Sequence, residues 1–285
     1  MYEVEFLKPE SIAAASRVLG DNPDEAKVVG GGTAVVLMLT QRLIAPRYLI
    51  SLGHLSGLRG LTYKPGDGLH VGSLVTHYEM ESSPVVRKAA PILAETFHKV
   101  ANIRVRHQAT VGGVLAEADY ASDPPAMLLA LRARVKATSE RSERWIELSD
   151  FFRDFYETAL EHDEIITEVF VPEMAPGTGT AYIKFNTRSS EDRPCVGVAA
   201  VAERRDGVCE GLRVVVGAVA GTPQEVPEAE ALARGREITE DLAREIGHAY
   251  AEAIDPISDM RGSDWYRRQV IEVLVRRAIL QAMRA

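Results

Sequence analysis

The sequence predicts an α+β fold made of two domains, and three observations support this prediction. An apolar run, three glycines, a helix-like segment and a strand pattern follow one another from Ala26 to Leu52, as in a βαβ unit. A stretch rich in Pro and Gly, 173–179, has the composition of a linker. Beyond it, three strand patterns precede helical segments, which is typical of an antiparallel sheet covered by helices.

Composition and charge limit the classes of function that the chain can have. The 285 residues are 46% hydrophobic, enough for a sizeable core. The net charge of −8 and the lack of a basic cluster argue against nucleic acid as a partner. No apolar run approaches the roughly 20 residues of a membrane helix, and the acidic N-terminus is unlike a signal peptide, so we expect a cytoplasmic protein without a membrane span. Cys195 and Cys209 are too few for a metal site of four thiolates, and we expect both to be buried on strands.

The first domain is expected to span 1–173, with lobes at about 1–55 and 56–173. In the first lobe, strand and helix patterns alternate: strands 2–7, 27–29 and 48–52, and helices 12–19 and 33–43. In the second lobe, the expected elements are short strands within 58–71, helices within 77–101, strands 135–139, 144–148 and 164–172, and a short helix near 151. Thr76 and Glu79 have the spacing of a capping box that starts a helix at His77, so we interpret His77 as structural.

The second domain is expected to span 174–285. Its strands are predicted at 181–186, 195–203 and 212–219, and its helices at 228–234, 240–253 and 264–283. Ser263 is expected to cap the last helix.

Three glycines, Gly30 to Gly32, form the first candidate site. Glycine lets the backbone approach a ligand closely, and the following helix start offers unpaired N–H groups and a partial positive charge. Such a site suits a phosphate. The alternative interpretation is a flexible turn.

The stretch 103–125 is the second candidate site, because a long structureless loop inside a compact domain is usually functional. It contains Gly112 and Gly113 and ends in the helix-start pattern Ser122-Asp123-Pro124-Pro125. Asp123 has two interpretations. It caps the helix, or it accepts hydrogen bonds from ribose hydroxyls.

Four separated segments together resemble the FAD-binding subunit of the molybdenum hydroxylases, the family of the carbon monoxide dehydrogenase medium subunit and the xanthine dehydrogenase FAD-binding subunit. Gly30–Val35 is similar to the family's AGGTDL loop, and Ala109–Gly113 to its ATVGGN loop, with Asp123 at the family's following Asp. Tyr182–Arg188 with Val196–Ala200 resembles YxKxxRR…VGVA, and Ser258–Arg268 resembles SDxRGSxxYRR. The resemblance extends from about Glu5 to Ala282.

This resemblance implies a fold, a cofactor and partners. The fold would be a two-lobed, PCMH-like FAD-binding domain followed by a C-terminal domain like that of carbon monoxide dehydrogenase flavoproteins. The chain would be an oxidoreductase subunit that holds FAD. It would take electrons from a small [2Fe–2S] subunit, fed by a large molybdopterin subunit, and pass them to an external acceptor such as NAD⁺, a quinone or O₂. The expected assembly is a heterotrimer, single or paired. No catalytic or metal-binding residue of its own is implied.

The resemblance also implies cofactor-binding residues. Backbone amides of two segments would wrap the FAD pyrophosphate and the flavin, namely Val29, Gly30, Gly31, Gly32, Thr33, Ala34 and Val35, and Thr110, Val111, Gly112, Gly113 and Val114. Asp123 would bind a polar part of FAD, and Ile166 would be an apolar wall against a ring. Lys184 would lie near the flavin, where a cation stabilises negative charge on the reduced ring. The alternative for Lys184 is a solvated lysine at a strand end.

Two departures from the family pattern leave a second function open. Ala34 replaces an Asp and Val114 replaces an Asn. The alternative is therefore a binding or assembly subunit with weak or lost FAD binding, and a third interpretation is a free-standing flavin oxidase. The leading hypothesis requires the two glycine segments, roughly eighty residues apart, to form a single pocket of peptide N–H groups.

Overall fold

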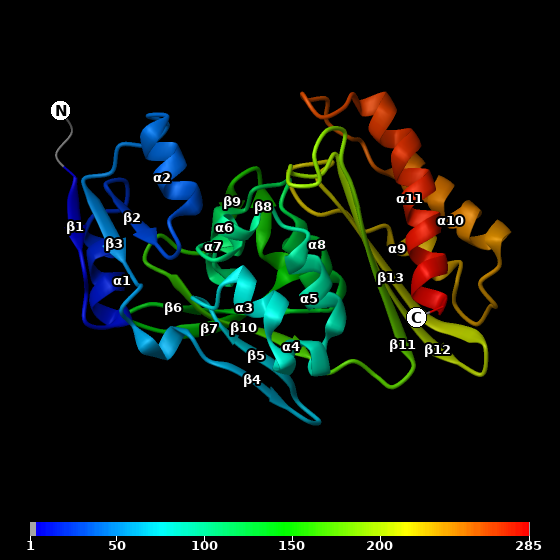
Figure 1. Ribbon diagram of the computed structural model, residues 1–285, viewed down its shortest axis with the longest axis horizontal. Coiled ribbons are helices and arrows are strands. Elements are labelled where there is room, and N and C mark those ends of the chain that lie inside the picture. The colour runs from blue at the N-terminus through cyan, green and yellow to red at the C-terminus, as the bar shows by residue number, and fades with distance from the viewer. Residues whose placement is uncertain (1–3, 285) are drawn as a thin grey trace.

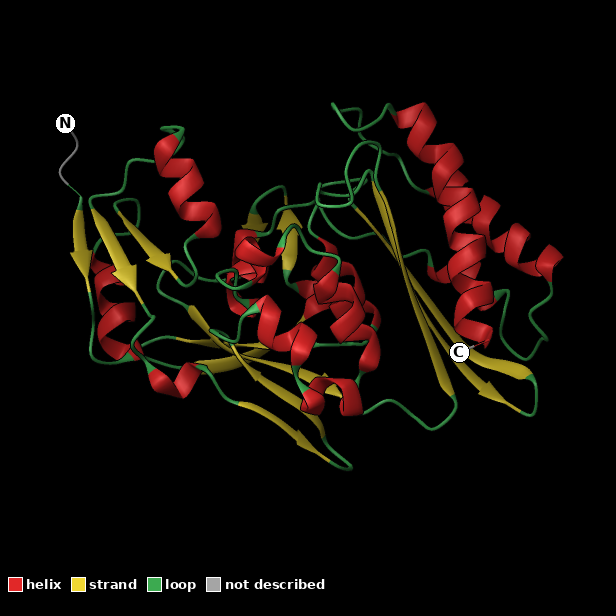
Figure 2. Cartoon of the chain, viewed as in Figure 1, coloured by secondary structure: helices red, strands yellow, loops and turns green. Residues whose placement is uncertain are grey.

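The computed structural model describes residues 4–284 and confirms the α+β fold. Figure 1 shows a small N-terminal lobe, a central lobe and a C-terminal domain arranged side by side along the long axis. Figure 2 shows that each of the three parts has its own sheet with helices packed on it. The strand orders are β1-β3-β2, β4-β5-β10-β6-β7 and β11-β12-β13, with a two-stranded sheet β8-β9.

The N-terminal lobe has the predicted βαβ arrangement. Its strands β1 (Glu5–Leu7), β2 (Ala26–Val29) and β3 (Tyr48–Ser51) are parallel, and its helices are α1 (Ile12–Asp21) and α2 (Thr33–Thr40). Ala15 of α1 packs with Ile50 of β3 in the core of this lobe. The first residues of the expected strand at 2–7 lie outside the described residues.

Contacts at α1 join this lobe to the next. Glu140 N donates to Ser16 Oγ at 2.8 Å, and the Arg17 guanidinium pairs with the Glu140 carboxylate. Leu74 and Ile165 of the second lobe also belong to the core of the first. The two lobes therefore share a core.

The second lobe is an antiparallel sheet covered by helices. Its strands are β4 (Leu61–Lys64), β5 (Gly68–Gly72), β10 (Ile165–Pro172), β6 (Arg134–Thr138) and β7 (Glu143–Glu147). Its helices are α3 (His77–Ser82), α4 (Pro84–Ala89), α5 (Pro91–His98), α6 (Ile103–Arg106), α7 (Val111–Glu117) and α8 (Asp123–Ala130), with short 3₁₀ turns at Ser56–Leu58 and Leu148–Asp150. A hairpin of β8 (Phe152–Asp154) and β9 (Glu157–Thr158) was not expected.

The expectation of a structureless loop at 103–125 is wrong, because α6 and α7 lie within it. Local side chains start both helices. Asn102 Oδ1 accepts from Val105 N at 3.2 Å, and Thr110 Oγ1 accepts from Gly113 N at 3.1 Å. Asp123 is the first residue of α8, and Ser122 occupies the N-cap position. Asp123 is therefore not the cap.

The C-terminal domain is the predicted meander with helices on one face. Its strands are β11 (Thr178–Phe185), β12 (Val196–Arg205) and β13 (Val208–Gly217), and its helices are α9 (Pro227–Ala231), α10 (Glu240–Ala253) and α11 (Asp264–Arg284). Ala200 faces the core under α10 and α11, whereas the neighbouring Ala199 faces the core of the second lobe. Ser263 Oγ accepts from Tyr266 N at 3.2 Å, as the predicted cap requires.

The expected domain boundary at 173/174 stays a prediction. β11 begins at Thr178, inside the expected linker. Cys195 and Cys209 are both buried, with Cys209 on β13 and Cys195 immediately before β12. From Val4 to Arg284, no helix is both long and apolar enough to cross a membrane.

The predicted capping box at Thr76 is present, and it holds His77 in the interior. Glu79 N donates to Thr76 Oγ1 at 3.1 Å, and Thr76 N donates to Glu79 Oε2 at 2.7 Å. The His77 ring is 1% exposed and lies with its edge against Phe97, the ring centroids 4.9 Å apart. Burial lowers the pKa of His77 from 6.5 to about 4.

We therefore predict that His77 destabilises the protein in mild acid. Well above pH 6.5 the ring is neutral in both the folded and the unfolded state and adds no pH dependence. Between pH 6.5 and about 4, the unfolded state binds a proton that the folded state does not. The free energy of unfolding therefore decreases as the pH is lowered through this range, by at most about 3 kcal/mol. Urea unfolding at several pH values should show a smaller fall for His77→Met. The exposed His162→Met is the control, and equal pH dependence in the two variants would contradict the prediction.

Candidate functional site

The first glycine segment ends β2 and opens α2. Gly32 is the N-cap residue, and its φ of 76° lies in the left-handed region that favours glycine. It offers no side-chain acceptor, so the first-turn amides of α2, from Thr33 to Val35, are not capped. These N–H groups and the positive end of the helix dipole suit an anion.

The two glycine segments lie against each other. A Cβ placed on Gly31 would lie 1.6 Å from the carbonyl oxygen of Gln108, and one on Gly30 would lie 2.9 Å from Thr110 Oγ1. No side chain fits at Gly31 unless the segments separate. The two segments therefore meet, whereas a single pocket formed by the N–H groups of both stays a prediction.

The second segment uses its own amides inside the protein. Val111 N donates to Val75 O at 2.9 Å, Gly112 N to Ser73 O at 2.8 Å, Gly113 N to Thr110 Oγ1 at 3.1 Å and Val114 N to Thr110 O at 3.0 Å. A Cβ on Gly112 would lie 2.5 Å from the Ser73 Cβ, so the loop after β5 packs directly on this segment. The amides left for a diphosphate are those of the first segment. A cofactor role for Thr110–Val114 stays a prediction.

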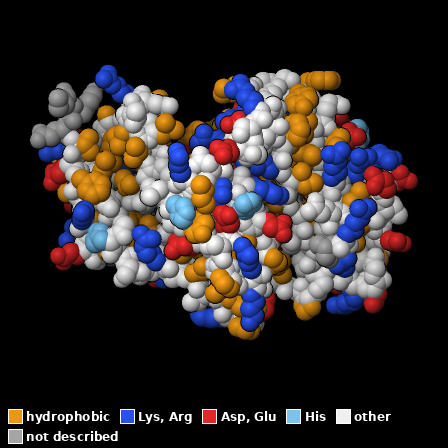
Figure 3. Space-filling model, viewed as in Figure 1, with side chains coloured by type: hydrophobic (Ala, Val, Ile, Leu, Met, Phe, Trp, Pro, Cys, Tyr) orange, Lys and Arg blue, Asp and Glu red, His pale blue; other side chains and the backbone are white. Residues whose placement is uncertain are grey.

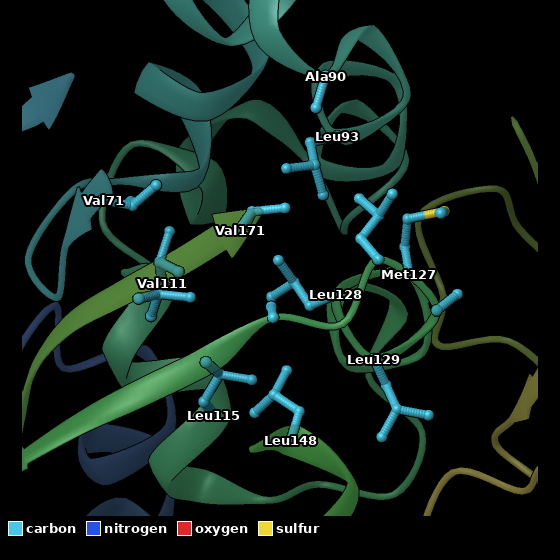
Figure 4. Close-up of a cluster of buried hydrophobic side chains, with 14 of the residues drawn as sticks. Val71, Ala90, Leu93, Val111, Leu115, Met127, Leu128, Leu129, Leu148 and Val171 are labelled. Carbon is cyan, nitrogen blue, oxygen red and sulfur yellow. The ribbon is translucent and has the colours of Figure 1, made fainter. Parts of the chain in front are cut away.

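The two departures from the family pattern lie differently. Val114 is 9% exposed and belongs to the core of the second lobe. In Figure 4 two other side chains of this core, Val111 and Leu115, point toward Leu128 of α8. Ala34 is half-buried in the first turn of α2. Because the open donors of that turn are backbone N–H groups, they do not depend on the side chain at 34.

Asp123 and Lys184 form a buried ion pair. Asp123 Oδ2 lies 3.0 Å from Lys184 Nζ, with the side chains 4% and 7% exposed, and Asp123 Oδ1 accepts from the Tyr182 hydroxyl at 2.8 Å. Burial raises the pKa of Asp123, although both partners favour the charged form. The interpretation of Lys184 as a solvated lysine is therefore wrong. The cofactor roles of both residues stay predictions.

A second lysine, Lys99, lies beside this pair and was not predicted. Lys184 Nζ donates to Lys99 O at 2.7 Å, and Lys99 Nζ donates to Tyr182 O at 2.6 Å. Burial lowers the pKa of Lys99. A single lysine after a helix gives no sequence signal, since its neighbours here come from a strand more than eighty residues later.

Ile166 lies in the main core and is 4% exposed. The pairing of β10 with β6 is irregular between Ile166 and Glu168, and the intervening Thr167 accepts a hydrogen bond from Ser73 N at 3.1 Å. Ile166 thus lies on the part of β10 that bonds the loop packed against the second glycine segment. Its role as a wall against a ring stays a prediction, as does the role of Val29 at the end of β2.

A cluster of charges at the end of α7 was also not predicted. Burial, aided by Asp119, raises the pKa of Glu117 to about 7, and Lys27 and Arg193 oppose that rise. Arg193 Nε lies 2.5 Å from Asp119 Oδ2. Charged groups from β2, α7 and the loop before β12 therefore converge where the second segment ends.

The geometry fits a dinucleotide cofactor with a diphosphate. The close approach at Gly31 leaves an uncapped helix start beside the second segment, as an anion site requires. In Figure 3 the outline is notched at its upper edge between the N-terminal lobe and the C-terminal domain. Among residues 4–284, no three His, Cys, Asp or Glu side chains gather as metal ligands would.

Comparison with family models gives two matches. Residues 2–174 match the FAD binding domain in molybdopterin dehydrogenase, and residues 181–282 match the CO dehydrogenase flavoprotein C-terminal domain.

Individual proteins are similar along the whole chain. The nicotine 6-hydroxylase medium subunit of Paenarthrobacter nicotinovorans is 36% identical over 279 residues, which are 98% of this chain and 97% of that protein. A chain of carbon monoxide dehydrogenase from Hydrogenophaga pseudoflava, in a form that lacks the Mo-pyranopterin moiety, superposes with a TM-score of 0.95 at 30% identity, covering 98% and 97% of the two chains. A chain of quinoline 2-oxidoreductase from Pseudomonas putida 86 gives 0.92 at 30%, covering 99% and 97%.

We predict that Gly31→Ala separates the two segments. The new methyl group meets the Gln108 backbone, which cannot move aside as a flexible side chain can. The variant should be destabilised by about 1–3 kcal/mol and should lose most of its affinity for FAD, measured by urea unfolding and fluorescence titration. Gly57→Ala is the matched control, because a Cβ there meets nothing within 4 Å. Equal FAD affinity in both variants would show that the close approach does not shape the site.

Proposed function

We propose an electron-transfer role from one premise: this chain belongs to the family of FAD-binding medium subunits of the molybdopterin dehydrogenases, which are oxidoreductases with FAD as cofactor. In this role the chain takes electrons from a [2Fe–2S] partner subunit and passes them to an external acceptor. A large molybdopterin subunit oxidises the substrate. The chain itself therefore positions a cofactor and selects no substrate.

One observation supports the proposal most strongly, the contact of the Gly31 backbone with Gln108. It brings the uncapped start of α2 beside the segment that leads to Asp123. The diphosphate of FAD would be bound by the first-turn amides of α2, and the neighbouring residues Thr110 and Gly113 would line the same site.

The buried lysine gives these residues an electrostatic role. FAD supplies the redox chemistry when it is bound. Lys184 would hold a positive charge near the flavin, and Asp123 and the Lys99 carbonyl fix the position of its ammonium group. Because the Lys184 side chain is only 7% exposed, little solvent screens this charge, and the Asp123 carboxylate 3.0 Å away is what partly offsets it.

The partner subunits are inferred from the family. The nicotine 6-hydroxylase relative is named a medium subunit, so that protein acts as one of several chains. We infer the same for this chain, with a large molybdopterin subunit and a small [2Fe–2S] subunit in a heterotrimer.

A deflavination experiment tests the role. The complex purified from its native source should contain stoichiometric FAD, iron and molybdenum. Removing FAD with a chaotropic salt should leave iron–sulfur reduction by the substrate intact and abolish reduction of the external acceptor, and added FAD should restore it. Acceptor reduction that persists without FAD would contradict the proposal. A complex without molybdenum and iron would contradict the partner assignment.

A further inference from the structure

A five-residue connector, Ala118–Ser122, joins the second glycine helix α7 to α8, which begins with Asp123. It has no regular secondary structure, and Ala118 has a φ of 49°, a strained value for a residue with a Cβ. A shift of the connector would move α7, which carries the second glycine segment, and the Asp123 carboxylate at the start of α8. The conformation of the connector therefore needs contacts that fix it.

The C-terminal domain holds it at Tyr120. Ala218 N donates to Tyr120 O at 3.1 Å. The Tyr120 hydroxyl donates to Asp259 Oδ2 at 2.9 Å and lies 3.0 Å from Arg261 Nη1, which donates to it. Burial raises the pKa of Tyr120, which keeps its hydroxyl protonated as a donor. One side chain thus meets both charges of a loop about 140 residues later.

That loop is itself fixed by a buried arginine. Arg267 of α11 is 0% exposed, and its Nη2 donates to Asp259 Oδ1 at 2.7 Å. Its other nitrogens donate to the carbonyl oxygens of Cys195 at 3.1 Å, Gly262 at 3.2 Å and Ile257 at 2.5 Å. Charged hydrogen bonds that converge in the interior make a stiff support, because an unpaired arginine there would be very costly.

We propose that Tyr120 is a positioning residue for the FAD site, through which the C-terminal domain sets the path of the connector. The role proposed for the phenol is to hold the connector rather than to bind the cofactor itself. The phenol transmits the position of the Asp259–Arg261 loop to α7 and to Asp123. The inference rests on FAD binding and is independent of the proposed electron flow.

The test compares Tyr120→Phe with Tyr63→Phe. Each removes one hydroxyl that bonds a carboxylate, but Tyr63 lies on β4, away from the connector, and pairs with Glu173, which follows β10. Tyr120→Phe should raise the Kd for FAD about tenfold, the scale of a lost hydrogen bond to a charged group, and should change the visible circular dichroism of bound FAD. In the apoprotein it should speed hydrogen exchange across 111–122. Tyr63→Phe should change none of these.

The outcomes separate positioning from general stability. Unchanged FAD affinity and flavin dichroism in Tyr120→Phe would overturn the proposal, even if its Tm falls. Arg261→Met, which removes the second partner of the phenol, should reproduce the effect, and wild-type behaviour in that variant would also count against it. Because exchange is measured without cofactor, these results stay informative if the electron-transfer role fails.

Discussion

The structure depends on the backbone of Gly31 lying directly against the backbone of Gln108. This contact joins two segments that belong to different lobes, one ending a parallel strand and the other starting a short helix. The amide groups of the two segments have different roles. The second segment uses its amides to bind the loop after β5, and so becomes a rigid support, while the first keeps its helix start uncapped for an anion. Neither lobe alone contains this arrangement.

The C-terminal domain contacts the second lobe through side chains that meet Asp123 of α8. The helices of this domain pack on one face of its sheet. The other face places Tyr182 and Lys184 against Asp123 of α8. A buried carboxylate between a lysine and a phenol is stable only while all its partners stay in position, since an unpaired charge in the interior is costly. The buried ion pair of Asp123 and Lys184 is therefore also a contact that joins the C-terminal domain to α8.

Much of the fold could be predicted from the sequence because its signals are local. The strand, glycine and helix pattern at 26–39, the capping box at Thr76 and the meander after 178 each depend on neighbouring residues. The short helices α6 and α7 could not, since both are too brief for an apolar period and α7 also contains two glycines. The environment of Lys184 and the approach of Lys99 arise from tertiary contacts across more than eighty residues, which no local pattern encodes.

The most direct measurement of the central claim is amide hydrogen exchange of the purified chain with and without FAD. The account predicts slower exchange on FAD binding in 30–36, where the open amides of the first segment lie, and no change in the distant helix α11. The already bonded amides of 111–114 should be slow in both states. Protection by FAD that leaves 30–36 unchanged would contradict the account.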